Sequence, residues 1–256
     1  MIPIVMLNRH LIFIIMMQVN YLDLSRGFTY VEFDYIHKVD WTYRASNYEF
    51  SYNVIESHIN EPESYALEFA ILKVNNKATL KSILSIIRND VNVKEIIETT
   101  PLNTGYPKKM SIVLKVKLDN STRFRAYRLG GIEVKDIIVN GVENWGFALP
   151  SLSEVNRLKQ YLAMGGEVKN MRTRRINADE LIYMTSYSKL TPFLSKGELK
   201  VLKTAYELGF FSEPRKATLS KVADALGLST TTVNYELRKG IYKLLTLVLR
   251  EGYQDY

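Results

Sequence analysis

A run of short polar side chains near the C-terminus offers the clearest chemistry in the sequence. Serine and threonine hydroxyls can approach phosphates and base edges closely, and an asparagine amide can pair with adenine through two hydrogen bonds. Lysine and arginine can neutralise phosphates. The residues of this run with such chemistry are Ser229, Thr230, Thr231, Thr232, Asn234, Tyr235, Arg238 and Lys239. We interpret them as a surface that contacts the major groove of double-stranded DNA, with no catalytic residue and no metal ligand among them.

Two short helices and a tight turn would present these residues. Thr218 can cap the first helix, and Gly227 tolerates the positive φ that a tight turn needs. Ser229 then caps the second helix, and Ala223 is small enough to let the helices cross closely. The inward positions are Leu219, Val222, Leu226, Leu228, Val233, Leu237, Ile241, Leu244 or Leu245, and Val248. The pattern predicts a helix-turn-helix whose second helix reads DNA.

A scaffold helix precedes this pair. Ser195 and Glu198 have the spacing of a capping box, and Gly209 supplies a stop. We expect Leu199, Leu202 and Tyr206 to form its inner face.

One residue departs from the pattern of a DNA-binding surface. Glu236 lies in the second helix, where phosphates would repel an acid. Three arrangements remain open: the side chain faces away, pairs with Arg238 or Lys239, or accepts a hydrogen bond from a cytosine amino group.

The stretch from Leu194 to Leu245 resembles the helix-turn-helix domain of the archaeal bacterio-opsin activator family of transcription regulators. The matching segments are AYELGFF, PRKATL, VADALGLS and STTTVNYELRKG. Upstream, NGVENWGFALPSLSEVNRLKQYLAMGGEV is more loosely similar to the regulatory N-terminal region of that family. The family has no single fixed effector, so the resemblance implies none. As DNA-contacting residues it implies Thr230, Thr231, Thr232, Asn234, Tyr235 and Arg238.

The preceding part of the chain alternates between strand and helix patterns. FTYVEFDYIH from Phe28, YALEFAILKV from Tyr65, VNVKEIIETT, KMSIVLKVKL and EVKNMRTRR are typical of strands, and Asn140-Gly141 indicates a hairpin. NKATLKSILSIIRND and SLSEVNRLKQYLAM have helical spacing. Two β-α-β units in series predict an α+β fold class, with a ferredoxin-like domain over residues 20–190 and an all-α helix-turn-helix domain over 191–256.

Composition sets limits on partners and location. The net charge of +7 permits a polyanion partner, and the absence of cysteine excludes thiolate chemistry and fits a reducing, cytoplasmic location. The apolar segment in residues 1–19 is too short to span a bilayer and lacks a cleavage site, so we expect no membrane association. It is interpreted as a buried strand or as a start assigned upstream of Met16 or Met17.

Histidine, acidic, aromatic and basic residues elsewhere in the sequence could also take part in metal binding, catalysis or ligand binding. The histidines, His10, His37 and His58, lack the close spacing of a zinc site, so we expect no metal and no cofactor. Glu32 and Asp34 lie on one face of a strand without a nucleophile motif, so we expect no enzyme. The aromatic segment 34–50 forms a core, lines a ligand pocket or binds an extended strand. The basic segment 169–175 flanks DNA or is a solvated strand edge.

These observations favour a sequence-specific transcription regulator, with an N-terminal domain that senses an unidentified small-molecule or protein effector or mediates assembly. The alternatives are a module that docks on the transcription machinery and a ligand-binding enzyme in the N-terminal domain. The C-terminal helix is too rich in leucine to bury every apolar residue on one face, so we expect a homodimer through it, unless the N-terminal domain covers the surplus. The residues concerned are Leu244, Leu245, Leu247, Val248 and Leu249.

Overall fold

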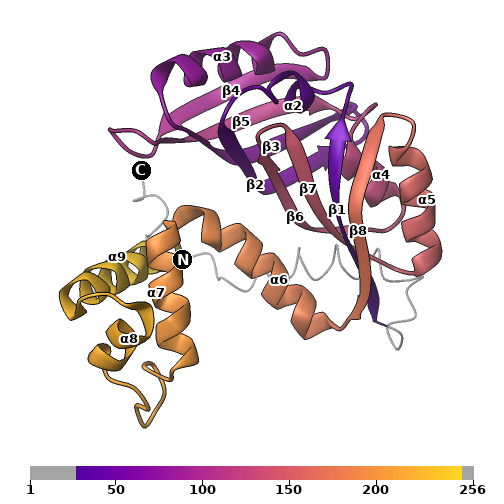
Figure 1. The fold of residues 1–256 in the computed structure, drawn as a ribbon. Coiled ribbons are helices and arrows are strands. Elements are labelled where there is room, and N and C mark those ends of the chain that lie inside the picture. Colours follow the sequence, from indigo (N-terminus) through magenta and orange to yellow (C-terminus); the bar gives the residue numbers. More distant parts are fainter. Residues whose placement is uncertain (1–26, 250–256) are drawn as a thin grey trace, which may run out of the picture. The chain divides into compact units, whose positions relative to one another are not determined.

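The computed structural model describes residues 27–249 and divides the chain into two compact units, Met1–Lys189 and Leu190–Tyr256 (Figure 1). The apolar segment 1–19 lies outside the described residues. Among the helices of the described part, none is long and apolar enough to cross a membrane.

The N-terminal unit is built on one antiparallel sheet, with the strand order β4-β5-β3-β2-β6-β7-β1-β8. The strands are β1 Phe28–His37, β2 Phe50–Asn60, β3 Tyr65–Val74, β4 Val93–Pro101, β5 Lys108–Lys117, β6 Ile132–Val139, β7 Val142–Leu149 and β8 Gly166–Ile176. The helices between them are α2 Trp41–Arg44, α3 Lys77–Arg88, α4 Thr122–Arg128 and α5 Leu152–Leu162. The predicted mixed α+β class is confirmed for this unit.

The sheet consists of two halves of four strands. One half has the order β4-β5-β3-β2 and is consecutive in sequence, whereas the other has the order β6-β7-β1-β8 and takes β1 from the start of the fold. The chain therefore crosses between the halves twice, from β1 through α2 to β2 and from β5 through α4 to β6. The halves join where β2 pairs with β6.

Alternating burial along the strands places most of the core on one face of this sheet. Ile83 and Ile87 of α3 pack over one half, and Leu158 and Leu162 of α5 pack over the other. Tyr30 lies on the opposite face, in a smaller cluster to which the start of α6, Ala178–Leu190, contributes. Both α3 and α5 therefore pack on the same face of the sheet.

Most of the predicted elements of this unit are found, and four elements were missed. The hairpin turns at Asn140 and Gly141, which both have positive φ as such a tight turn requires. The missed elements are β2, α2, α4 and α6. Two of the missed helices, α2 and α4, are too short for a helical period to show in the sequence.

The C-terminal unit contains a short 3-10 turn, Thr191–Phe193, followed by α7 Lys196–Glu207, α8 Leu219–Leu226 and α9 Thr230–Leu249. The buried residues of its hydrophobic core cluster are Val201, Ala205, Val222, Ala223, Val233 and Leu237. The predicted inner face of α7 is wrong in part, because the buried stripe runs through Val201 and Ala205 while Tyr206 is 76% exposed. Leu228 and Val248 are likewise exposed instead of buried, because the small core ends before it reaches them.

Candidate nucleic-acid interface

The turn between α8 and α9 sets the direction of α9. Gly227 has a φ of 64°, a left-handed conformation that a residue without a side chain adopts at little cost. The next amide, Leu228 N–H, donates to the Ala223 carbonyl at 3.0 Å, so the turn closes against the end of α8. At the other end of α8, the Thr218 hydroxyl accepts from Lys221 N–H at 3.2 Å. α8 is therefore fixed at both ends.

The start of α9 is held by its own hydroxyl side chains. Ser229 Oγ accepts from Thr232 N–H at 3.1 Å, and the hydroxyls of the two residues are hydrogen-bonded at 2.8 Å. Thr230 and Thr231 are exposed in the same turn. Ser229 and Thr232 thus cap the helix, while Thr230 and Thr231 have hydroxyls that face solvent.

One face of α9 is buried and the other is polar and exposed. Val233 and Leu237 are buried against α7 and α8, whereas Asn234, Tyr235 and Arg238 are exposed. These three residues lie three or four positions apart from Thr231 or from one another, so they share one side of the helix. All the predicted contact residues are therefore exposed on the first two or three turns of α9.

Lys239 differs from its neighbour Arg238. Its ammonium group lies 3.8 Å from Glu198 Oε1 and 5.4 Å from the centroid of the Tyr235 ring. An approaching phosphate would have to compete with these two partners for Lys239. Arg238 is exposed and is the better candidate for a phosphate contact.

The structure also resolves the position of Glu236. A Cβ atom added at Gly197 would lie 3.1 Å from Glu236 Oε2, so this carboxylate reaches the first turn of α7. Of the three arrangements left open by the sequence, the one in which Glu236 faces away from the exposed polar side is found.

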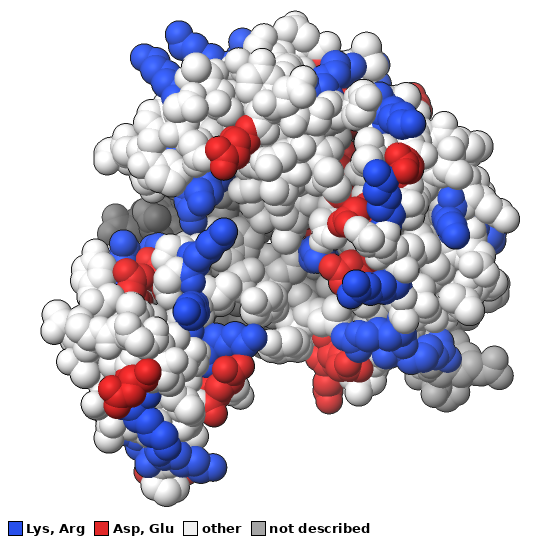
Figure 2. Space-filling model, in the orientation of Figure 1, with Lys and Arg blue, Asp and Glu red and all other residues white. Residues whose placement is uncertain are grey.

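Residues 194–246 carry nine Lys and Arg against five Asp and Glu, so this segment is net positive. On the face of the molecule drawn in Figure 2, basic and acidic residues are interspersed and do not form one continuous basic patch.

The same segment, residues 194–246, matches the family model of an HTH DNA binding domain. The segment is a helix-turn-helix DNA-binding domain. Its resemblance to the bacterio-opsin activator type is thereby confirmed, and duplex DNA is the partner that such a domain binds. No curated protein matches the chain.

A partly buried ion pair, which the sequence did not predict, links α9 of this helix-turn-helix domain to α7. Glu198 is fully buried, completes the capping box with Ser195 and accepts from Lys243 Nζ at 2.7 and 2.6 Å. Burial alone would raise the pKa of Glu198, but the hydrogen bonds from Lys243 and from Ser195 N–H lower it below its usual value. The capping box was predicted, whereas the partner lies 45 positions away and leaves no local signal.

Gly240 is a second feature of the helix-turn-helix domain that the sequence did not reveal. A Cβ added there would lie 2.7 Å from Cδ1 of Leu202, because α7 and α9 approach each other closely at this point. This close approach sets the crossing of the two helices.

The acidic, basic and aromatic residues outside the helix-turn-helix that could take part in catalysis or binding have mainly structural contacts. Glu32 pairs with Lys135, and Asp34 accepts from Asn144 at 2.6 Å, so the two acids have separate partners. The basic segment 169–175 lies in the edge strand β8 and is mostly exposed. In the aromatic segment, Trp41 packs on Phe50 and Tyr52 with ring centroids 5.9 and 5.2 Å apart, as in a core.

Proposed function

We propose that this protein is a sequence-specific transcription regulator that inserts the start of α9 into the major groove of duplex DNA. The observation that carries the proposal is the two-sided character of α9. Val233 and Leu237 anchor one side in the core, while the first turns of the other side expose hydroxyl, amide, phenol and guanidinium groups. Docking surfaces for proteins usually centre on a large apolar anchor, whereas this face is mainly polar.

The proposed contacts follow from the chemistry of each side chain. Thr230, Thr231 and Asn234 contact base edges, with the asparagine amide paired to adenine and a threonine methyl against a thymine methyl. Tyr235 and Arg238 contact the sugar-phosphate backbone and set the register. Ser229, Thr232 and Lys239 act mainly by holding and flanking the helix start, since they already have partners within the domain.

We further propose a homodimer through the C-terminal half of α9. The helix continues for about two and a half turns beyond Gly240, its last buried residue, and most of the side chains there are apolar and partly or fully exposed. Exposed apolar residues in this half include Leu245, Leu247, Val248 and Leu249. Pairing with the same surface of a second copy would bury them and place two recognition helices on half-sites about one DNA turn apart.

For the N-terminal unit we propose a regulatory or assembly role. Each half of its sheet has the strand order expected of a ferredoxin-like unit in which β1 and β5 have exchanged places. A DNA-binding regulator works where the DNA is, so we infer a cytoplasmic location.

Selection of bound sequences from a pool of random duplexes tests the proposal. The full chain should enrich one motif, and a variant with Thr230, Thr231 and Asn234 replaced by alanine should stay folded and lose the enrichment. Tyr206→Ala is a matched control, because Tyr206 is exposed on α7 of the same domain. If the folded full chain binds no duplex, or binds all duplexes equally, the protein does not bind DNA sequence-specifically.

A further inference from the structure

A small polar cavity lies in the N-terminal unit, where the chain crosses between the two halves of the sheet. Its volume is about 50 Å³, and residues next to both crossings, through α2 and through α4, line it. A cavity of this size accommodates an ion with one or a few waters, but not a metabolite. The polar side chains that matter here are His37, Asp40, Asp136 and Glu143.

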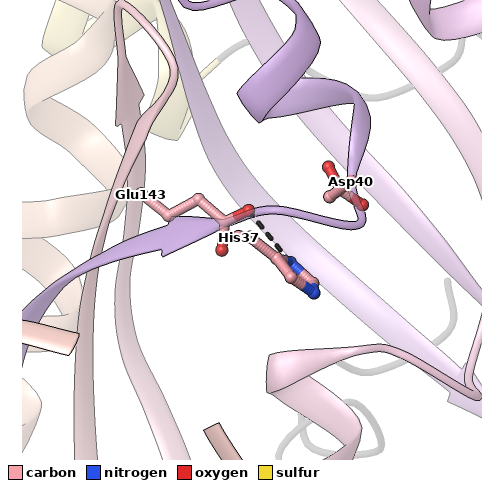
Figure 3. A group of neighbouring side chains, drawn as sticks. All are labelled: His37, Asp40 and Glu143. Carbon is pink, nitrogen blue, oxygen red and sulfur yellow. Dashed lines mark hydrogen bonds and ion pairs between the residues drawn. The ribbon is translucent and has the colours of Figure 1, made fainter. Parts of the chain in front are cut away.

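Three of the lining residues converge from different elements (Figure 3). His37 ends β1, Asp40 immediately precedes α2, and Glu143 lies in β7. One potential ligand atom from each of the three lies within 4.8 Å of the others, and His37 Nδ1 is 3.2 Å from Glu143 Oε1. His37 and Glu143 are only 5% and 3% exposed.

We propose that His37, Asp40 and Glu143 bind a divalent transition-metal cation. One imidazole nitrogen and two carboxylates are ligands that Zn²⁺ takes, at about 2.0–2.2 Å, and the cavity leaves room for a water ligand at an open position. Two ligands of one tetrahedral ion lie roughly 3.4 Å apart, close to the spacing of the His37 and Glu143 atoms. The third oxygen reaches the ion by a side-chain adjustment of Asp40.

Neighbouring residues already hold the proposed ligands in place. The Thr42 hydroxyl donates to Glu143 Oε1 and Trp145 Nε1 donates to Glu143 Oε2, each at 2.8 Å. The Thr42 amide donates to Asp40 Oδ1 at 3.1 Å. Such outer hydrogen bonds orient metal ligands and strengthen binding.

The charge around the cavity independently favours a cation. Asp136 lines the same cavity and is buried, and its Oδ1 atom has no hydrogen-bond partner within the described part of the chain. Its other oxygen accepts from Arg123, which also bonds Glu68 and Glu133 and is therefore shared among three acids. Asp40 and Glu143 add two more carboxylates, so negative groups outnumber positive ones at this place. Burial raises the pKa of Asp136 well above its usual value, so this carboxyl is held neutral unless further positive charge compensates it.

Without a metal, protons compete for the same side chains. Burial and the nearby charge of Glu143 raise the pKa of Asp40 to about 7. Burial opposes protonation of His37, but the hydrogen bond and the charge of Glu143 raise its pKa above the usual value. A bound dication would displace the protons from these side chains, so metal binding should release protons.

This site departs from the sequence-based expectation of no metal, which rested on the wide spacing of the histidines. Only one histidine takes part, and its partners come from positions that the fold brings together. The alternative arrangement is an ion pair between protonated His37 and Glu143, with Asp40 serving only as the cap of α2. The two arrangements make opposite predictions for metal titration.

The test is a titration of the chelator-treated full chain with Zn²⁺, and with Mg²⁺ as the comparison ion. Both tryptophans of the protein, Trp41 and Trp145, line the cavity, so their fluorescence reports binding there. We expect one Zn²⁺ per chain by calorimetry, a change in tryptophan fluorescence and no comparable response to Mg²⁺. Binding of Co²⁺ in place of Zn²⁺ should give visible absorption bands from a nitrogen- and oxygen-ligated ion.

Asp40→Asn is the decisive variant, because asparagine keeps the helix cap and the shape of the side chain but removes the charge. It should weaken Zn²⁺ binding by about 100-fold or more while the melting temperature without metal falls little. The matched control is His58→Gln at an exposed histidine, which should bind Zn²⁺ like the unchanged protein. Absence of Zn²⁺ binding by the full chain, or equal binding by a folded Asp40→Asn variant, would overturn the proposal. The readouts do not involve DNA, so they are independent of the proposed regulatory function.

Discussion

At the scale of single residues, substitutions of Asn234 and Arg238 test base recognition and phosphate binding separately. Both are exposed on α9, one turn apart. Asn234→Ala should cost about 1–3 kcal/mol of binding free energy on the preferred site and relax the choice of base at one position. Arg238→Ala should weaken binding to all sequences alike and lower the salt slope by about one. Binding isotherms at several salt concentrations, on preferred and scrambled duplexes, measure both. An unchanged salt slope would remove Arg238 from the interface.

Glu198 is a second single residue with a testable role, because its charge links the stability of the helix-turn-helix domain to pH. Its pKa is lowered in the folded state, so its contribution is fully present above the ordinary glutamate pKa of about 4.3. The contribution is lost as the pH falls through the lower pKa of the folded domain. Glu198→Gln should lower the free energy of unfolding at pH 7 by about 2 kcal/mol and flatten the pH dependence below the ordinary glutamate pKa of about 4.3. Urea unfolding followed by circular dichroism measures this; a parallel pH profile in the variant would show that another group is responsible.

At the scale of elements, the turn between α8 and α9 depends on backbone conformation and not on space. No atom lies within 4 Å of a Cβ added at Gly227, but its φ of 64° is unfavourable for a branched side chain. Gly227→Val should therefore destabilise the C-terminal unit by about 2 kcal/mol, whereas Gly227→Asn should cost less, because asparagine tolerates this conformation. Thermal unfolding of the two variants compares the costs directly. Equal melting temperatures would mean that the turn relaxes to another conformation.

At the scale of the whole molecule, the proposed dimer predicts a defined change in mass. The full chain should be a dimer at micromolar concentration by light scattering, and Leu245→Glu combined with Val248→Glu should give a folded monomer, because charges at these exposed positions would repel across the interface. The monomer should also lose the preference for paired half-sites while it still binds a single half-site. If the protein without substitutions is a monomer at every concentration, the dimer proposal is wrong. The N-terminal domain of the same chain would then be expected to cover the leucines.

The sequence by itself determined the elements that carry local signals. Strand alternation located β1, β3 and β5, helical spacing located α3 and α5, and capping residues with Gly227 located the helix-turn-helix. The exposed side of α9 was also predictable, because the cap at Ser229 and the apolar period of Val233 and Leu237 fix which side of the helix faces outward.

Only the tertiary structure decided which of these elements become neighbours. A period shows which face of a strand is buried, but it does not show which strand pairs with it, so the pairing of β1 with β7 and β8 left no trace in the sequence. For the same reason, the pairing of Glu198 with Lys243 and the meeting of His37 with Glu143, 106 positions apart, could not be predicted. Contacts between distant positions arise from packing of the whole chain, and packing is a property of the fold and not of any local segment.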